Sequence, residues 1–310
     1  MTTFFFLNVD LFILMIYNLV ITSQGDLIMR LVTHNGSILV KRFGYERSIS
    51  LLAEAGFDAY DCTMDGVAAF PKQDDYIEIA KRIKRHADSL AFPCAQAHSD
   101  FYRLKGKEDF DEIVKTHLRT LEVCEILECP ILVVHPGNDF SAQQNHEWLY
   151  SKLLPTAERR GVKIATENMW NWDSEKNQAT SLNAACGTIE SFCEQVDLGN
   201  SPYLTACVDI GHAEMTDAPG AANLIRALGH DRVGCLHVHD NDLIGDYHQV
   251  PFTGKIKWDE VISALRDINY QGDFTYECFT FYSYLPEELI PSALSYMEKL
   301  GRYFIRRLTK

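Results

Sequence analysis

The feature that most constrains the fold is a regular alternation of short apolar runs with longer amphipathic ones. Eight short runs are rich in β-branched and other apolar residues; they cover residues 29–34, 57–63, 91–98, 130–135, 162–168, 204–210, 232–239 and 273–279. Helical spacing of apolar residues between them predicts helices over 46–56, 75–90, 108–128, 143–160, 179–195, 219–228, 257–267 and 285–307. Near-continuous apolar strands are typical of parallel sheets that are buried on both faces.

Eight strands that are each followed by a helix predict an α/β fold, a (β/α)8 TIM barrel, formed as a single domain by residues 29–310. A doubly wound open sheet is the structural alternative, but no Gly-x-Gly-x-x-Gly segment follows the first strand. No linker, repeat or low-complexity segment divides this region. The sequence therefore favours one closed barrel.

Residues 1–28 stand apart from this pattern. The apolar stretch over 4–21 contains Asp10 and has no Lys or Arg before it. A signal peptide begins with positive charge, and a membrane-spanning helix tolerates a central Asp poorly. Met29 opens the first strand. We expect residues 1–28 to be an apolar extension outside the fold, with an export or anchoring segment as the alternative.

Charge and cysteine usage limit the partners and the compartment. The formal net charge is −14 and no basic stripe is visible, which argues against a nucleic-acid or membrane partner. The nine cysteines include no Cys-x-x-Cys pair, and several lie inside strand-like runs. This usage predicts reduced, buried thiols in a cytoplasmic protein.

Four of the apolar runs in the second half of the chain end in a carboxylate or an imidazole: Glu167, Asp209, His237 and Glu277. The carboxyl ends of barrel strands meet at one mouth, where three carboxylates repel one another unless a cation neutralises them. Carboxylates with imidazole suit Mn²⁺, Zn²⁺ or Fe²⁺. The pattern predicts a metal site. Trp170 and Trp172 follow Glu167 and would form an apolar wall for a substrate, or simply fill the rim.

Five more residues are expected at the same mouth as additional metal or substrate ligands: His98, His135, His212, Asp246 and His248. The mouth residues also have structural alternatives: a lone histidine at a strand end can be a hydrogen-bonded core residue, and Glu167 or Glu277 alone could pair with a lysine. Asp209 and His212 can merely cap a helix. His239 lies two residues beyond His237 on the same strand face, and only one of the two needs to be a ligand.

The runs VVHPG, TENMW, CVDIGHA, LHVHDND, DYHQVPFTGKIKW and YE resemble the xylose isomerase-like TIM-barrel superfamily. This superfamily contains sugar isomerases, ketose 3-epimerases, inosose dehydratases and endonuclease IV-type AP endonucleases, and the resemblance covers about residues 29–306. Similarity to the ketose epimerases implies one divalent metal, Mn²⁺, Zn²⁺, Mg²⁺ or Co²⁺, held by the four strand-end residues. It also implies Glu167 and Glu277 as the catalytic acid/base pair, and His212 on the substrate. The substrate arginine of those epimerases has no counterpart in HVHDNDL.

Similarity to endonuclease IV implies something different. All nine residues of the two sets above fall on its three-zinc site, yet the segments NMWNW and IGHAEM depart from it and no basic, groove-filling loop is visible. We therefore expect an isomerase or epimerase that acts on a sugar or sugar phosphate through a metal-stabilised enediolate. The sequence leaves the oligomeric state open, with a homo-oligomer as one option. The alternatives are an AP endonuclease, a dehydratase of a polyol or inosose, and a barrel that binds a sugar or metal without turnover.

Overall fold

The computed structural model describes residues 29–102, 106–215 and 218–310, so the expected extension over 1–28 lies outside the described residues. Its inner wall consists of parallel strands: β1 (Leu31–His34), β2 (Ala59–Thr63), β3 (Cys94–His98), β4 (Ile131–Val134), β5 (Lys163–Glu167), β8 (Leu204–Asp209), β9 (Val233–His237) and β10 (Phe274–Tyr276). They pair in the order β10-β1-β2-β3-β4-β5-β8-β9. A parallel bridge between Val238 and Tyr276 brings β9 back to β10 and closes the ring. The predicted single-domain TIM barrel is confirmed.

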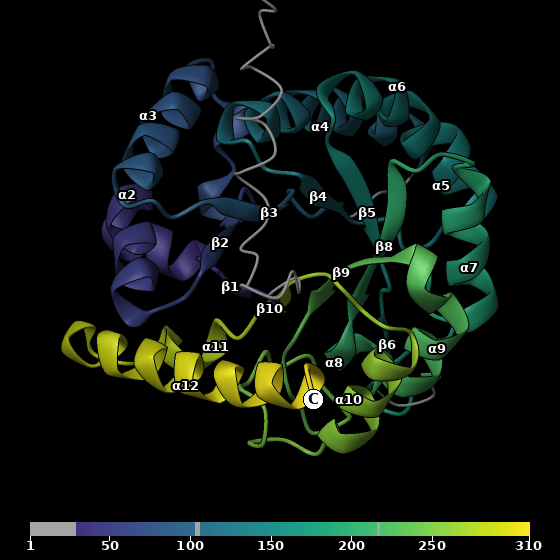
Figure 1. Cartoon of the computed structure of the whole chain (residues 1–310). Coiled ribbons are helices and arrows are strands. Elements are labelled where there is room, and N and C mark those ends of the chain that lie inside the picture. The colour runs from purple at the N-terminus through teal and green to yellow at the C-terminus, as the bar shows by residue number, and fades with distance from the viewer. Residues whose placement is uncertain (1–28, 103–105, 216–217) are drawn as a thin grey trace, which may run out of the picture.

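Helices surround this ring of strands (Figure 1). The longer ones are α2 (Ser37–Ala55), α3 (Tyr76–Ser89), α4 (Lys107–Leu127), α6 (Ser151–Arg160), α7 (Ile189–Leu198), α9 (Ala221–Arg232), α10 (Trp258–Asp267) and α12 (Ile290–Leu308). The short ones are η1 (Gly66–Ala68), η2 (Phe70–Lys72), α5 (Ala142–Asn145), η3 (His146–Tyr150), α8 (Ile210–Ala213), α11 (Thr280–Ser283) and η4 (Glu287–Leu289). Their apolar faces pack on the strands in one large core, which contains the fully buried Phe110, Phe192 and Phe304.

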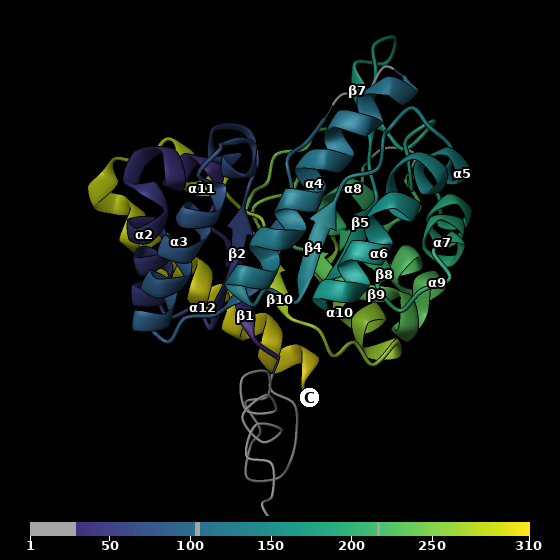
Figure 2. The ribbon, with the colours of Figure 1, turned by 90° about the horizontal axis from the view of Figure 1, so that it is seen from above.

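The segment 179–195 is not the continuous helix that its spacing predicts. The chain leaves β5 into a hairpin in which β6 (Asn171–Asp173) runs antiparallel to β7 (Gln178–Thr180), and α7 begins only at Ile189. Asn183 and Cys186 have φ angles of 58° and 54°, which a right-handed helix cannot contain. Figure 2 shows this hairpin beyond the end of the barrel toward which the strands point.

Two layers fill the inside of the barrel. The lower layer consists of small apolar clusters: Val32, Ala59 and Ala95, and Ile131, Val133, Ala165, Cys207 and Cys235. Glu167, Asp209 and His237 each follow one of these residues by two positions on the same strand, so they share its face. The apolar layer therefore lies directly beneath the polar residues at the strand ends.

Cysteine usage and hydropathy add two observations on the described residues. All nine cysteines are free; eight are buried and Cys193 is half-buried, as the strand-like context of several of them predicts. Among the described helices, none combines the length and the apolar character that crossing a membrane requires.

Candidate functional site

The nine residues expected at the barrel mouth all lie there, and none of them is fully exposed. Four strands end in them: β3 in His98, β5 in Glu167, β8 in Asp209 and β9 in His237. The others follow directly or lie in the loops beyond: His135 after β4, His212 in α8, Asp246 and His248 between β9 and α10, and Glu277 after β10.

Three carboxylates converge on one imidazole nitrogen. Nδ1 of His237 lies 3.2 Å from Oε1 of Glu167, 3.3 Å from Oε2 of Glu277 and 3.9 Å from Oδ2 of Asp209. Since all four side chains are at most 7% exposed, water screens their repulsion poorly. This donor set, gathered around one point, fits a divalent cation of the Mn²⁺ or Zn²⁺ type.

The pKa shifts show how strongly these groups act on one another. Burial raises the pKa of Glu277 to about 8, although His237 and His248 oppose it. Burial also acts to raise the pKa of Glu167, but the charges of His237 and His135 outweigh it and hold that pKa well below its usual range. Burial acts to lower the pKa of His237, yet Glu277 and Glu167 raise it well above the ordinary value. Imidazole charge and a proton on Glu277 therefore balance part of the negative charge.

A second group lies on the other side of Glu167. Nε2 of His135 is 3.1 Å from Oε2 of Glu167 and 3.0 Å from Nε2 of His98. Nδ1 of His98 is in turn 3.4 Å from Oε1 of Glu277. His98, His135 and Glu167 have ligand atoms within 4.8 Å of one another, so they too could hold an ion. Each oxygen of Glu167 thus faces a different imidazole.

A third group gathers around Asp246. Its Oδ2 lies 3.0 Å from Nε2 of His248 and 3.4 Å from Nε2 of His212. Nδ1 of His212 is 2.8 Å from the carbonyl oxygen of Asn168, which fixes the proton on Nδ1 and leaves Nε2 facing the carboxylate. His212, His239, Asp246 and His248 have ligand atoms within 4.8 Å of one another.

His239 is a mouth residue outside the predicted set of nine. Its Nε2 lies 3.0 and 3.1 Å from the two oxygens of Asp209. A Cβ at Gly211 would come within 1.9 Å of Cε1 of His239, so only glycine leaves room for this ring. The two-residue offset from His237 was the available signal, because it puts both imidazoles on one face.

Two further buried residues, neither of them predicted from the sequence, support His237 from below. Nε2 of Gln96 donates to Oδ2 of Asp61 at 2.7 Å and lies 2.9 Å from Nε2 of His237. Asp61 and Gln96 are 0% and 2% exposed. Partners on the far nitrogen of a metal-binding imidazole fix its orientation. Here they turn Nδ1 of His237 toward the three carboxylates.

Aromatic rings line the mouth unevenly. The half-buried ring of Trp170 lies edge-on to His212, with 6.4 Å between the ring centroids. Trp172 lies on the β6 strand and is 51% exposed. Phe279, which was not among the predicted residues, stacks on His248 with 4.3 Å between centroids and an interplanar angle of 27°. Its position two residues after Glu277 was the only signal.

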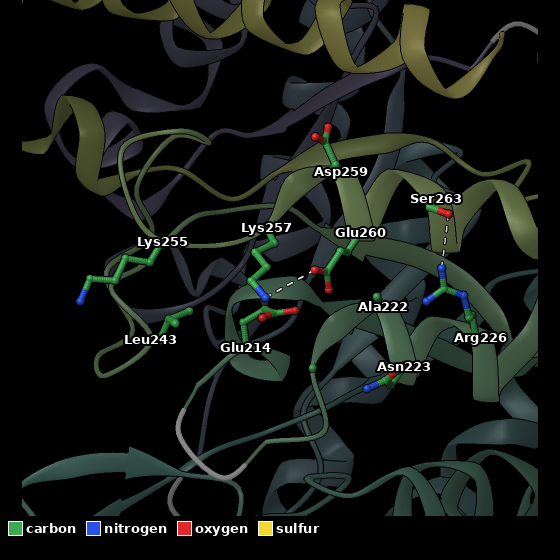
Figure 3. Close-up of a pocket in the computed structure, with 11 residues that line it drawn as sticks. Glu214, Ala222, Asn223, Arg226, Leu243, Lys255, Lys257, Asp259, Glu260 and Ser263 are labelled. Atoms are coloured by element: carbon green, nitrogen blue, oxygen red, sulfur yellow. Dashed lines mark hydrogen bonds and ion pairs between the residues drawn. The ribbon is translucent and has the colours of Figure 1, made fainter.

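A separate cavity of about 600 Å³ is lined by α9, α10 and the loops before them rather than by strand ends (Figure 3). Arg226 on its wall donates to Asp267 at 2.7 Å, and Lys257 lies 3.4 Å from Glu260. None of the nine predicted mouth residues lines it. The residues predicted to carry the chemistry therefore lie at the barrel mouth and not in this cavity.

Residues 49–300 match the family model of the xylose isomerase-like TIM barrel, and the chain belongs to this family. The solved structure of a D-tagatose 3-epimerase-like protein has a TM-score of 0.70 at 20% identity, covering 91% of this chain and 98% of that one. The IolI protein with a bound zinc atom has a TM-score of 0.68 at 17% identity, covering 89% and 98%. The D-psicose 3-epimerase of Enterocloster bolteae is 35% identical over 102 residues, which is 32% of each chain.

Proposed function

We propose that the protein is a divalent-metal-dependent sugar isomerase or epimerase. The observation that carries this proposal is the convergence of Glu167, Asp209 and Glu277 on Nδ1 of His237 in a buried mouth. Membership of the xylose isomerase-like family supports it, as does the similarity to a D-tagatose 3-epimerase-like protein and to part of a D-psicose 3-epimerase. The substrate is a small sugar or sugar phosphate.

The four strand-end residues, Glu167, Asp209, His237 and Glu277, would hold the metal as Mn²⁺, Zn²⁺, Mg²⁺ or Co²⁺. When bound, such an ion polarises the carbonyl and neighbouring hydroxyl oxygens of a ketose and so acidifies the C–H bond between them. The rest of the chemistry belongs to the protein's own side chains.

Glu167 and Glu277 transfer the proton in this proposal. They approach the common point from β5 and β10, with β8 and β9 between these strands, so they face a bound sugar from different sides. One carboxylate removes the proton from carbon and the other returns one, either to the same carbon or to its neighbour. Return to the opposite face of the same carbon is epimerisation, and return to the neighbour is isomerisation.

Other mouth residues position the sugar. Nε2 of His212, which lies 3.4 Å from Oδ2 of Asp246, can bind a hydroxyl group. Trp170 and Phe279 supply apolar faces against which a sugar ring or chain can pack. His98, His135, Asp246 and His248 remain available either to the substrate or to further ions.

A second candidate is endonuclease IV-type cleavage of DNA at abasic sites. One observation favours it: two further groups, around His135 and around Asp246, could each hold an ion beside the central one. Clustered ions of this kind stabilise both the attacking and the leaving oxygen of a phosphodiester. The net charge of −14 favours a small substrate over DNA.

The test is carbon–hydrogen exchange with solvent combined with metal counting. The protein is loaded with Mn²⁺ or Zn²⁺ and incubated in D₂O with D-fructose, D-psicose and D-tagatose. We expect one tightly bound ion per chain and deuterium on a sugar carbon, with no exchange after chelation. Three zinc ions per chain, cleavage of abasic-site DNA and no exchange would replace the proposal by the nuclease. Loss of water from an inosose would replace it by a dehydratase, and metal binding without any turnover by a binding protein.

A further inference from the structure

His34 is a mouth residue to which the chemistry above gives no role. It ends β1, next to the strand that leads to Glu277, and it is 4% exposed. Its ring centroid lies 5.4 Å from that of His98 and 6.2 Å from that of Phe279. Ligand atoms of His34, His98 and Glu277 all lie within 4.8 Å of one another. The imidazole is therefore part of the same polar layer as the proposed catalytic residues.

Both ring nitrogens of His34 are enclosed, and neither has a hydrogen-bond partner among the described residues. A buried polar group without a partner costs about 1–3 kcal/mol, and nearly all such groups in proteins are satisfied. A residue that only filled space here could be apolar at no such cost. The unpaired nitrogens therefore point to a partner that the described part of the chain does not supply.

The surroundings indicate which kind of partner this is. The proposed metal ligands converge on Nδ1 of His237, and His34 makes none of those contacts. Beside His34 lies Phe279, an apolar face, and a neutral imidazole offers one donor and one acceptor. A hydroxyl group likewise donates and accepts, so an imidazole next to an aromatic face matches a carbon chain that carries hydroxyl groups.

We propose that His34 is a substrate-binding residue, whose imidazole hydrogen-bonds a hydroxyl group of the sugar held at the barrel mouth. The inference rests on the proposed function and deepens it, because it assigns the β1 side of the mouth to the polyhydroxy chain. His34 touches the substrate and takes no part in moving the proton.

The experiment compares His34→Phe, which keeps a planar ring without hydrogen bonds, with His34→Gln, which keeps a donor and an acceptor. Metal content and the affinity for D-fructose, D-psicose and D-tagatose are measured on the metal-loaded proteins by calorimetry. We expect His34→Phe to weaken sugar binding by about fivefold to thirtyfold, the loss of one buried hydrogen bond. His34→Gln retains most of the affinity, and all three proteins bind the same amount of metal.

The remaining outcomes separate this inference from the proposed function. If the wild type and His34→Phe bind sugar equally well and the wild type shows exchange in D₂O, the inference about His34 is overturned and the proposed isomerase function stands. A drop in metal content in His34→Phe makes His34 a metal ligand and also overturns it. If His34→Phe weakens sugar binding but the wild-type protein shows no exchange in D₂O, the isomerase proposal is overturned and the substrate-binding role of His34 stands. A wild type that binds none of the three sugars overturns both.

Discussion

At the lower end of the barrel, where the strands begin, two carboxylates, those of Asp58 and Asp273, are each held by a guanidinium. Arg30 donates to the two oxygens of Asp273 at 2.9 and 2.6 Å, and Arg302 of α12 donates to those of Asp58 at 2.6 and 2.8 Å. At the mouth, by contrast, Glu167, Asp209, Asp246 and Glu277 have no Arg or Lys partner among the described residues. Their partners are histidines.

The difference separates a structural use of charge from a functional one. A guanidinium is permanently charged and forms two parallel hydrogen bonds with a carboxylate, so both oxygens of Asp58 are occupied. An imidazole can give up its proton, and a carboxylate that faces only imidazoles can exchange them for a metal or a substrate. The ion pairs at the lower end therefore join strand starts to one another and to α12, whereas the mouth leaves its carboxylates and imidazoles available to a ligand.

The largest expected effect of a single substitution falls on the mouth. Glu167→Gln keeps the shape of the side chain but removes its basicity, so we expect turnover of the accepted sugar to fall by about 100-fold to 10,000-fold. The matched change at the lower end, Asp273→Asn, should lower the melting temperature and leave turnover unchanged. Equal losses of turnover in both variants would show that the two ends do not differ in function. Turnover is measured by sugar isomer analysis, and stability by calorimetry.

Metal addition should act on the mouth as a stabilising ligand. An ion present at 100 times its dissociation constant stabilises the folded protein by about 2.7 kcal/mol, which corresponds to a rise in melting temperature of about 5–10 °C. We expect this rise when Mn²⁺ or Zn²⁺ is added to the chelated wild type. Asp209→Asn should abolish most of it. A variant of the lower end, Arg302→Met, should show the full rise, and a missing rise in the wild type would contradict the metal site.

Removing the side chain that supports His237 from within the barrel should have a smaller effect than removing a metal ligand. Gln96→Leu removes the group that contacts Nε2 of His237, and we expect metal affinity to fall by about 10-fold to 100-fold. Gln195→Leu is the matched control, because Gln195 is equally buried but lies on α7, away from the strand ends. Titration with Mn²⁺ measures both variants. If the control weakens metal binding as much as Gln96→Leu, the effect is one of general packing.

The sequence predicted the mouth better than the layer beneath it, for a physical reason. Strand ends can be located from apolar runs, and a carboxylate after such a run has few structural uses, so Glu167 and Asp209 were visible. Asp61 and Gln96 lie within their strands, where successive side chains point to opposite faces of the sheet. The face that each one occupies therefore depends on the exact register of the strand. The pairing of β2 with β3 contains a register shift between Tyr60 and Asp61, which no local pattern reveals. His34 was missed because its significance lies in having no hydrogen-bond partner within residues 29–102, 106–215 and 218–310, which is a property of the folded state.

The same limit explains the error over 179–195. Apolar spacing there matches a helix, but spacing alone says nothing about backbone angles. The positive φ of Asn183 and Cys186 arises as the chain folds back from the β6–β7 hairpin to the start of α7. The helix boundary is instead marked by Thr188, whose hydroxyl accepts the backbone N–H of Ser191. In this segment the capping residue indicates the start of α7 better than apolar periodicity does.

The smallest effect is expected where charge is used only for stability. Arg302→Met keeps the apolar stem but removes the fork that joins α12 to Asp58. Because both side chains are about one-third exposed, we expect a loss of only about 1 kcal/mol and a fall in melting temperature of about 2–4 °C. Arg302→Lys keeps the charge without the paired geometry and should fall between the wild type and Arg302→Met. Turnover and metal affinity should match the wild type in both variants. A change in turnover or in metal affinity would mean that the charge at the lower end influences the mouth over a distance, because neither Arg302 nor Asp58 contacts the mouth directly.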